Sequence, residues 1–321
     1  MSALVRTALI GAGSMGSLHA RVISQSPRAA LAAVIDPDRT AGERVADRFG
    51  AQWYPALDAV SDVDAVVVAA ATEKHPALGQ EVLGRGLPLL MEKPLAHELA
   101  DAQQLVELAA KADLPLMCGL LERYNPAVVT AAALLDTPRY IAAQRHSPYV
   151  ARIRTGVSSD LLLHDVDIAL RLAGAEPASV RGSFGFLHPD SQPGSEDVAE
   201  ALLGFPDGLV ANLSASRVSQ HKVRTLTIGE QNRLIELDLL RNSVTIYRHV
   251  LNEIEPDGLG YKQQTIIEIP ALATSREPLA AQLDRFLDLL DGTADLAEER
   301  AAILPAHRVI DRVRRDAVAQ D

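Results

Sequence analysis

Short apolar runs alternate with segments of helical periodicity through the first 120 residues. The runs end close to a Gly, Asp, Thr or Glu, and in the segments between them apolar residues recur every three to four positions. The predicted strands are residues 3–10, 31–35, 65–69, 88–91 and 116–119, and the predicted helices are residues 14–25, 40–49, 76–85 and 98–112. Strands that alternate with helices over short connections predict a doubly wound parallel sheet covered by helices on both faces.

The pattern changes after residue 121, where strand-like segments follow one another without helices between them. Predicted helices cover residues 125–135, 157–172, 277–290 and 298–315, and predicted strands cover residues 140–146, 180–187, 198–205, 209–216, 224–229, 234–239 and 244–249. Consecutive strands joined by hairpin-like turns predict an α+β domain with a mostly antiparallel sheet. We therefore expect two domains, at residues 1–121 and 122–321.

Composition excludes several classes of protein and of partner. The chain of 321 residues is 48% hydrophobic and 23% charged, as in ordinary globular proteins. Its net charge of −11 disfavours nucleic acid and anionic membranes as partners. Its apolar runs, such as residues 65–71, are far shorter than the roughly 20 residues of a membrane-spanning helix. The single cysteine, Cys118, cannot form an internal disulfide and lacks metal-ligand spacing. We expect a cytoplasmic protein without a metal site.

A glycine-rich turn follows the first predicted strand and opens the first predicted helix. It reads Gly11-Ala12-Gly13-Ser14-Met15-Gly16, and Asp36 ends the second strand twenty positions later. Such glycines allow a tight turn and a close approach to a pyrophosphate, which the helix N-terminus attracts. A carboxylate at the position of Asp36 accepts hydrogen bonds from ribose hydroxyls and repels a 2′-phosphate, so we expect NAD rather than NADP. The nearby guanidinium of Arg39 leaves some use of NADP open.

Two further segments carry groups suited to proton transfer. Lys93 lies in Glu92-Lys93-Pro94 directly after a predicted strand, where it could stabilise charge that develops on an oxygen. Asp160, His164 and Asp167 fall at helical spacing and would share one face, on which carboxylates flank an imidazole. Each segment alone also has a structural reading, as a solvated lysine or as a capped helix with a satisfied histidine.

Taken together, these motifs resemble the Gfo/Idh/MocA family of NAD(P)-dependent oxidoreductases, which act on CH–OH groups of sugars. The resemblance covers nearly the whole chain and includes the glycine turn, residues 68–75, the Glu-Lys-Pro motif, residues 123–126 and residues 160–167. It implies a Rossmann domain followed by a substrate-binding and oligomerisation domain. It further implies that Lys93 and His164 are catalytic and that Asp160 assists them. The cofactor residues it implies are Gly11, Gly13, Ser14, Met15, Gly16, Asp36, Arg39, Ala70, Thr72, His75, Glu92 and Lys93.

The chain departs from the family pattern at two places. Ala70-Ala71 stands where the family usually has Thr-Pro, so a cofactor contact there must come from the backbone or from Thr72. Thr155-Gly156 stands where the family usually has Gly-Gly before the histidine motif. Neither departure removes a group that could transfer a proton.

Arginines suggest the class of substrate. Residues 137–159 contain four arginines (Arg139, Arg145, Arg152, Arg154) and no acidic residue, and a second basic cluster includes Arg217, His221, Lys222 and Arg224. Arginine suits phosphate oxygens, although alternating outward charges on strands are the plainer explanation. Several segments resemble a branch of the family that oxidises C3 of nucleotide-linked amino sugars such as UDP-N-acetylglucosamine. This resemblance implies substrate contacts from Arg123, Tyr124, Asn125, Arg152, Arg154, Asp160 and His164.

Other functions of the same fold stay open. An inositol or free-sugar dehydrogenase and a ketosugar reductase would use the same proton-transfer groups. A regulator that binds NAD without turnover is a third alternative, which the presence of both Lys93 and His164 disfavours. The flat antiparallel sheet predicts self-association as a homodimer or homotetramer. The sequence leaves open the exact sugar, the pathway, the direction of reaction and whether Lys93 or His164 is the formal base.

Overall fold

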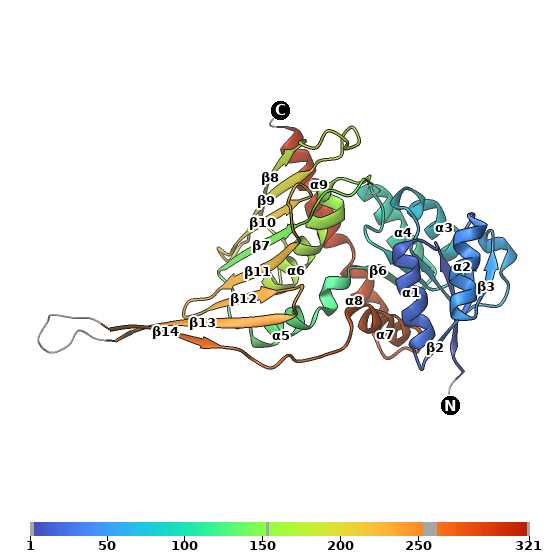
Figure 1. Cartoon of the computed structure of the whole chain (residues 1–321), viewed down its shortest axis with the longest axis horizontal. Coiled ribbons are helices and arrows are strands. Elements are labelled where there is room, and N and C mark those ends of the chain that lie inside the picture. The colour runs from blue at the N-terminus through green and yellow to red at the C-terminus, as the bar shows by residue number, and fades with distance from the viewer. Residues whose placement is uncertain (1–2, 152–153, 253–261, 320–321) are drawn as a thin grey trace, which may run out of the picture. The chain divides into compact units, whose positions relative to one another are not determined.

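The structure, a computed structural model, describes residues 3–151, 154–252 and 262–319. The chain divides into two compact units (Figure 1). Unit 1 comprises Met1–Leu121 and Glu277–Arg308, and unit 2 comprises Glu122–Arg276 and Val309–Asp321. Each unit contains one sheet, and each is described separately below.

Unit 1 is built on a six-stranded sheet in the order β3-β2-β1-β4-β5-β6, in which every pair is parallel. The strands are β1 (Val5–Ile10), β2 (Ala29–Ile35), β3 (Gln52–Tyr54), β4 (Ala65–Val68), β5 (Leu89–Glu92) and β6 (Leu116–Gly119). The predicted doubly wound parallel sheet is confirmed. The short edge strand β3 is an addition to the predicted strands.

The helices of unit 1 begin and end where their sequences provide stop signals. They include α1 (Ser14–Gln25), α2 (Arg39–Phe49), α3 (His75–Gly84) and α4 (Leu99–Lys111), with 3₁₀ turns at Leu57–Ala59 and Thr72–Lys74. Asp38 caps α2 by accepting a hydrogen bond of 3.1 Å from the Ala41 amide. Gly50 ends α2 in the left-handed conformation, with φ of 71°.

Two helices near the C-terminus also belong to unit 1. Arg21 and Arg28 of the first 30 residues form ion pairs with Glu277 and Asp288, at α7 (Pro278–Leu290). The guanidinium of Arg300 on α8 (Leu296–Ala301) donates to the Leu114 carbonyl at 3.0 Å. The predicted division placed all of residues 122–321 in one domain, so the structure differs from it over residues 277–308. The difference arises because these helices bury their apolar sides against unit 1, a long-range contact that periodicity cannot reveal.

The last predicted helix is interrupted. Where residues 298–315 were expected to form one helix, α8 ends at Ala301 and α9 runs from Leu304 to Val318. Pro305 has no amide hydrogen and is tolerated only in the first turn of a helix, which places a new helix start at this position. The first residues of α9 belong to unit 1, and those from Val309 onward belong to unit 2.

Unit 2 contains an eight-stranded sheet in the order β14-β13-β12-β11-β7-β10-β9-β8. The strands are β7 (Tyr140–His146), β8 (Ser179–Gly185), β9 (Val198–Gly204), β10 (Val210–Ser216), β11 (Val223–Gly229), β12 (Leu234–Asp238), β13 (Ser243–Asn252) and β14 (Lys262–Glu268). Only the pair β10–β7 is parallel, which confirms the mostly antiparallel prediction. The prediction did not include β14.

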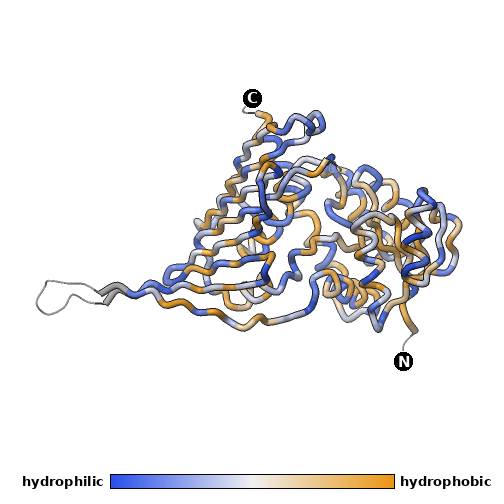
Figure 2. Tube along the Cα trace, viewed as in Figure 1, coloured by the Kyte–Doolittle hydropathy of each residue, from blue (hydrophilic) through white to orange (hydrophobic). Residues whose placement is uncertain are grey.

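Helices cover one face of this sheet. They are α5 (Pro126–Leu134), α6 (Leu163–Ala173) and the unit 2 portion of α9 (Figure 1). Hydrophobic and hydrophilic positions alternate along several strands (Figure 2), and β7 alternates between buried and more exposed residues. On β7, β9 and β10 the exposed positions include Tyr140, Leu202 and Val210, which are 42%, 49% and 37% exposed.

Candidate functional site

The glycine turn lies where three strands of unit 1 end together. Ile10 pairs with Ile35 of β2 and with Val68 of β4, so the residues that follow these strands meet at one edge of the sheet. Gly11 has a φ of 100°, and a Cβ on it would lie 2.6 Å from the Ala69 carbonyl oxygen. Only glycine meets both demands at this position.

The other two glycines of the turn have different surroundings. A Cβ on Gly16 would lie 1.9 Å from the Gly11 carbonyl oxygen, so Gly16 permits α1 to pack against the turn. A Cβ on Gly13 would have no atom within 4 Å, and Gly13 is exposed at the N-terminus of α1. Gly13 therefore leaves open space beside amides that can bind an anion.

A cavity of about 540 Å³ opens beside this turn. Its walls include Gly11, Gly13, Asp36 and Ala70, at the ends of β1, β2 and β4. The open space at Gly13 and the carboxylate at the end of β2 fit the pyrophosphate and ribose of a dinucleotide. When bound, such a cofactor supplies a nicotinamide ring that accepts or donates a hydride.

The Asp36 carboxylate is fixed by two backbone amides. Its Oδ2 accepts a hydrogen bond from the Ala12 amide at 2.7 Å, and its Oδ1 accepts one from Asp38 at 2.8 Å. The nearby guanidinium of Arg39 pairs with Glu43 at 2.8 Å and lies over the Trp53 ring at 5.4 Å. These contacts orient Arg39 toward α2 and β3, which weakens the argument for a 2′-phosphate partner.

The remaining predicted cofactor residues follow α1 and β4. Ser14 is exposed and Met15 half-buried in the first turn of α1, and Thr72 is half-buried in the 3₁₀ turn after β4. His75 is buried, with Nδ1 2.8 Å from the Pro94 carbonyl oxygen and Nε2 3.2 Å from that of Ala70. Burial lowers the pKa of His75, against the opposing effect of the two carbonyls. We expect His75 to act by positioning the backbone at Ala70 and Pro94.

Lys93 follows β5 at the same edge of the sheet and is half-buried. The preceding residue, Glu92, contacts His19 of α1 with its Oε1 and accepts a 3.3 Å hydrogen bond from the Lys93 amide with its Oε2. Burial by itself raises the pKa of Glu92, but His19 and the charge of Lys93 hold it below its ordinary value. Two residues after Lys93, the Leu95 amide donates to His307 Nε2 at 3.0 Å.

In unit 2 the expected regular helix from residue 157 is irregular at its start. Ser158–Leu162 form a π-helical turn, which contains Asp160, and α6 begins only at Leu163. The turn is held by the Glu196 carboxylate, which accepts a 2.7 Å hydrogen bond from the Ser158 amide, and by the Arg314 guanidinium, which donates to the Ser159 hydroxyl. Such turns often occur at functional sites. Asp160 and His164 are both half-buried.

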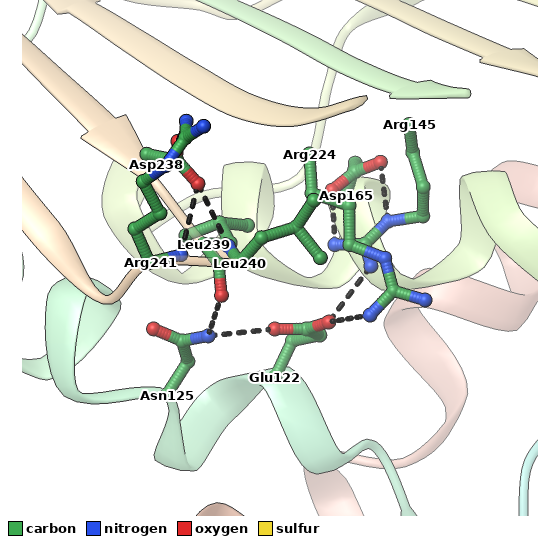
Figure 3. A network of polar contacts seen from close by, with 9 residues as sticks. All are labelled: Glu122, Asn125, Arg145, Asp165, Arg224, Asp238, Leu239, Leu240 and Arg241. Carbon is green, nitrogen blue, oxygen red and sulfur yellow. Dashed lines mark hydrogen bonds and ion pairs between the residues drawn. The ribbon is translucent and has the colours of Figure 1, made fainter. Parts of the chain in front are cut away.

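Arg145 forms buried ion pairs with Asp165 of α6 and with Glu122 (Figure 3). Arg145 of β7 is 1% exposed and donates two hydrogen bonds to Asp165, at 2.9 and 2.8 Å, and one to Glu122, at 2.7 Å. Burial raises the pKa of Asp165 against the opposing charge of Arg145. Burial by itself raises the pKa of Glu122, but Arg145 and Arg224 outweigh it and hold the pKa below its ordinary value.

Two predicted substrate residues have internal partners. Arg123 donates two hydrogen bonds to Asp167, at 2.7 and 2.6 Å, and both side chains are buried. Asn125 caps α5 and donates to the Glu122 carboxylate and to the Leu239 carbonyl oxygen. These contacts anchor Arg123 and Asn125 within unit 2, and their expected contact with the substrate stays a prediction. Asp167, which was expected to share a helix face with His164, forms an ion pair with Arg123.

The other predicted substrate residues are more accessible or lie outside the described residues. Tyr124 is half-buried in the turn Leu121–Tyr124, and Arg154 is exposed. Arg152 lies outside the described residues. Of the basic clusters, Arg145 and Arg217 are buried, and Arg217 donates to the Thr155 carbonyl oxygen. The basic clusters therefore offer fewer arginines to a phosphate than the sequence suggested.

Sequence reasoning missed the groups that hold these motifs in place. They include His19 behind Glu92, Glu122 and Asp165 around Arg145, and Glu196 beneath the π-helical turn. Each contact joins residues at least 20 positions apart, so local spacing carries no signal for it. The acidic residues Glu122 and Asp165, which precede and follow the arginine-rich segment 137–159 in the chain, could have indicated internal ion pairs.

The described residues offer neither a metal site nor a membrane span. No group of three or more His, Cys, Asp or Glu side chains among them is placed to hold a metal ion. No described helix has both the length and the apolar character that crossing a membrane requires.

Comparisons with known proteins agree with this architecture. Residues 5–120 match the oxidoreductase family described as having an NAD-binding Rossmann fold, and residues 128–235 match the GFO/IDH/MocA C-terminal domain. UDP-N-acetylglucosamine 3-dehydrogenase of Acidithiobacillus ferrooxidans is 32% identical over 292 residues, which cover 89% of this chain and 88% of that protein. A solved structure of the same enzyme superposes with a TM-score of 0.86 at 29% identity and covers 99% of both chains.

A second relative has a different named substrate. Inositol 2-dehydrogenase of Rhizobium meliloti is 28% identical over 308 residues, which cover 91% of each chain. Because the matches to the N-terminal and C-terminal domains together extend over most of the sequence, they identify both an NAD-binding domain and the domain that accompanies it. The chain therefore belongs to the Gfo/Idh/MocA family and is an NAD(P)-dependent oxidoreductase.

Proposed function

We propose that this protein is an NAD-dependent dehydrogenase that oxidises the C3 hydroxyl of a nucleotide-linked amino sugar such as UDP-N-acetylglucosamine. The observation that carries the proposal is the similarity, over nearly the full length of both chains, to UDP-N-acetylglucosamine 3-dehydrogenase. Residues 1–121 bind the dinucleotide, and the second domain binds the sugar and mediates self-association. The absence of internal disulfides is consistent with a cytoplasmic location.

The dinucleotide lies at the edge of the parallel sheet. Gly13 at the N-terminus of α1 would hold its pyrophosphate, and the Asp36 carboxylate would hold its adenosine ribose. The amides of Ala12 and Asp38 hold that carboxylate in place and leave oxygen lone pairs for ribose hydroxyls. Preference for NAD follows because the same carboxylate repels a 2′-phosphate.

Lys93 and His164 serve the chemical step. A bound nicotinamide would supply the hydride acceptor for C3, and one of these two residues would take the proton of the C3 hydroxyl. The other residue stabilises the negative charge that develops on the oxygen, and the product is a ketone. Asp160 assists from the π-helical turn.

The second candidate is an inositol dehydrogenase, favoured by the similarity to inositol 2-dehydrogenase over 91% of each chain. The buried positions of Arg145 and Arg217 reduce the support that arginines give to a phosphate-bearing substrate. The exposed side chains of Arg154 and Lys222 still offer positive charge. The two candidates share cofactor and proton-transfer groups and differ in the reacting ring and in the nucleoside diphosphate that only the first substrate carries.

A substrate panel tests the proposal. The purified protein is mixed with NAD and with UDP-N-acetylglucosamine, UDP-glucose, myo-inositol, scyllo-inositol or glucose, and NADH absorbance is followed. We expect the highest kcat/KM with UDP-N-acetylglucosamine and a 3-keto product, identified after reduction with borodeuteride. Faster turnover of an inositol would favour the second candidate. Tight binding of NAD without turnover of any sugar would favour the regulator.

Variants test the two proposed proton-transfer residues. Lys93→Ala and His164→Ala are each expected to lower turnover by roughly 10²–10⁴-fold, the usual span for loss of acid–base assistance. NAD binding by the His164→Ala variant should stay near that of the wild type. Turnover close to wild type in both variants would contradict the assignment.

The exposed sheet residues support self-association of unit 2. Tyr140, Leu202 and Val210 place apolar surface on strands whose other face is covered by helices. We propose a homodimer or homotetramer formed through this face. Light scattering of the wild type and of a Leu202→Lys variant should show the larger species only for the wild type.

A further inference from the structure

We infer that Arg145 and Arg123 are positioning residues that fix the rotation of α6 and thereby aim the His164 side chain. The inference rests on the proposed role of His164 and goes beyond it, because neither arginine needs to touch the substrate. It assigns a function to the two arginine–aspartate pairs beneath α6.

The two pairs bracket His164 on the helix. An α-helix turns by about 100° per residue, so Asp165 lies about 100° from His164 in one direction and Asp167 about 60° from it in the other. Asp165 is bound by Arg145 and Asp167 by Arg123. Rotation of α6 about its axis in either sense therefore strains one of the two pairs.

Both pairs have the geometry that gives directional restraint. Each aspartate accepts two hydrogen bonds from one planar guanidinium, at distances of 2.6 to 2.9 Å. Such bidentate pairs specify orientation as well as distance. Apolar packing is less directional and holds most of the remaining helix, including Val166, Ile168 and Ala169.

Arg145 is itself anchored to other elements of unit 2. Arg145 also donates to Glu122 at 2.7 Å, and Glu122 in turn contacts Arg224 of β11 and Asn125 at the start of α5 (Figure 3). The guanidinium of Arg145 is thus held between α6 and the segment that begins α5. Burial by itself lowers the pKa of Arg145, but its carboxylate partners outweigh that effect and raise the pKa, so the guanidinium stays charged.

An external restraint is useful here because the helix start is irregular. The π-helical turn Ser158–Leu162 directly precedes α6, so the N-terminal end of α6 lacks the regular turn that would otherwise fix its orientation. His164 is the second residue of α6. A proton-transfer group must be held closely, because a displacement of about 1 Å can cost 10²-fold in rate.

Three variants test the inference. Asp165→Asn removes one ionic acceptor, and Arg145→Lys keeps the charge but loses the planar two-point contact. Glu230→Gln is the matched control, because it breaks an ion pair of the same kind, with Arg233, in the turn between β11 and β12. Arg224, which contacts Glu122, lies at the opposite end of β11. We measure kcat, KM for sugar and cofactor, the melting temperature, and the ring resonance of His164 in protein with selectively ¹³C-labelled histidine. His164→Gln assigns that resonance.

A positioning role predicts a specific pattern. Asp165→Asn and Arg145→Lys should lower kcat by about 10- to 100-fold, with KM for NAD nearly unchanged, and should shift the His164 resonance. The melting temperature of Arg145→Lys should lie closer to the wild type than that of Asp165→Asn, because lysine keeps the charge. Its kcat should nevertheless stay as low as that of Asp165→Asn. Glu230→Gln should lower the melting temperature and leave both kcat and the His164 resonance as in the wild type.

The opposite results would overturn the inference. A wild-type His164 resonance in both variants, together with a lowered melting temperature, would reduce the arginines to a purely structural role. A kcat of Arg145→Lys equal to that of Glu230→Gln would lead to the same conclusion. If the wild type turns over no nucleotide sugar, the resonance of His164 still tests the inference, so failure of the proposed function is recognised separately.

Discussion

His19 and Glu92 form a buried contact in which His19 Nε2 lies 2.7 Å from Glu92 Oε1. The two residues are 2% and 8% exposed. His19 belongs to α1, which begins at the glycine turn, and Glu92 ends β5 directly before Lys93. A Cβ on Gly119 of the neighbouring strand would lie 3.0 Å from the Glu92 carboxylate, so the pair is tightly enclosed. The contact links the helix proposed to bind pyrophosphate with the strand that carries Lys93.

Replacement of Glu92 should have a pH-dependent effect on stability. The folded protein holds the pKa of Glu92 below its ordinary value of 4.5. A depressed folded pKa contributes stability above the unfolded value, and this contribution is lost as the pH falls through the folded pKa. We expect Glu92→Gln to lower the free energy of unfolding at pH 7 by about 1.5–3 kcal/mol, the range for a hydrogen bond to a charged group.

The measurement is a series of urea unfolding curves at pH values from 7 down to 3.5. The difference between wild type and Glu92→Gln should be constant above pH 5 and shrink as the pH falls below 4.5. A control variant, Glu43→Gln, removes an exposed carboxylate paired with Arg39 and should show a much smaller difference. A difference for Glu92→Gln that grows toward low pH would contradict the assigned direction.

Gly13 and Gly16 should respond differently to the same substitution. Gly13→Ala adds a methyl group to open space, so the fold should keep its melting temperature while the dissociation constant for NAD rises by about tenfold or more. Gly16→Ala places a methyl group 1.9 Å from the Gly11 carbonyl oxygen and should destabilise the protein by about 2–3 kcal/mol or more. Calorimetric titration with NAD and thermal unfolding measure the two effects. Unchanged NAD affinity in Gly13→Ala would contradict the proposal that the pyrophosphate binds at this turn.

The sequence was sufficient to predict the elements that have local signals. Strand–turn–helix punctuation at Gly11–Gly16 and the strand ending at Asp36 predicted the sheet edge, because chain direction and spacing alone place these residues there. The run of consecutive strands without helices between them likewise predicted the mostly antiparallel sheet that includes β7. The edge strands β3 and β14 were not predicted. β3 has only three residues, and the pairing of an edge strand depends on its neighbour in the sheet more than on its own residues.

The parts that the sequence did not predict depend on long-range partners. Arg145 looked like a surface cation from its neighbours in the chain, but Glu122 and Asp165 come 23 positions before it and 20 positions after it. Asp167 looked like a companion of His164, but Arg123 pairs with it across 44 positions. Charge complementarity between distant segments becomes visible only when the fold brings them together. For the same reason, the burial of α7 and α8 in unit 1 could not be read from their periodicity.

Asp36 should set the preference between NAD and NADP. Asp36→Ala removes the acceptor proposed for the ribose hydroxyls and the charge that repels a 2′-phosphate. The ratio of kcat/KM for NADP to that for NAD should rise by about tenfold or more, the size expected for one charge-assisted hydrogen bond. Steady-state kinetics with both cofactors at one ionic strength provides the measurement.

Asp38→Ala is the matched control for Asp36→Ala. Asp38 lies two positions away and caps α2, with its Oδ1 3.1 Å from the Ala41 amide nitrogen. Loss of the cap should lower stability by about 0.5–2 kcal/mol and leave the cofactor ratio unchanged. A ratio that shifts equally in both variants would show that general surface charge, rather than a contact at Asp36, determines the preference.

Gln282 provides a test of packing in unit 1. It lies on α7 and is 0% exposed, and neither its Nε2 nor its Oε1 has a hydrogen-bond partner among the described residues. A buried amide without partners is destabilising, so Gln282→Met, which has similar shape and no amide, should raise the free energy of unfolding by about 1–3 kcal/mol. Gln282→Ala also removes the amide but leaves a cavity, and the cost of that cavity should offset the gain. Thermal and urea unfolding of the three proteins measure the order of stability, which we expect to be Met above Gln and Ala. A Gln282→Met variant less stable than the wild type would mean that the amide is satisfied in solution.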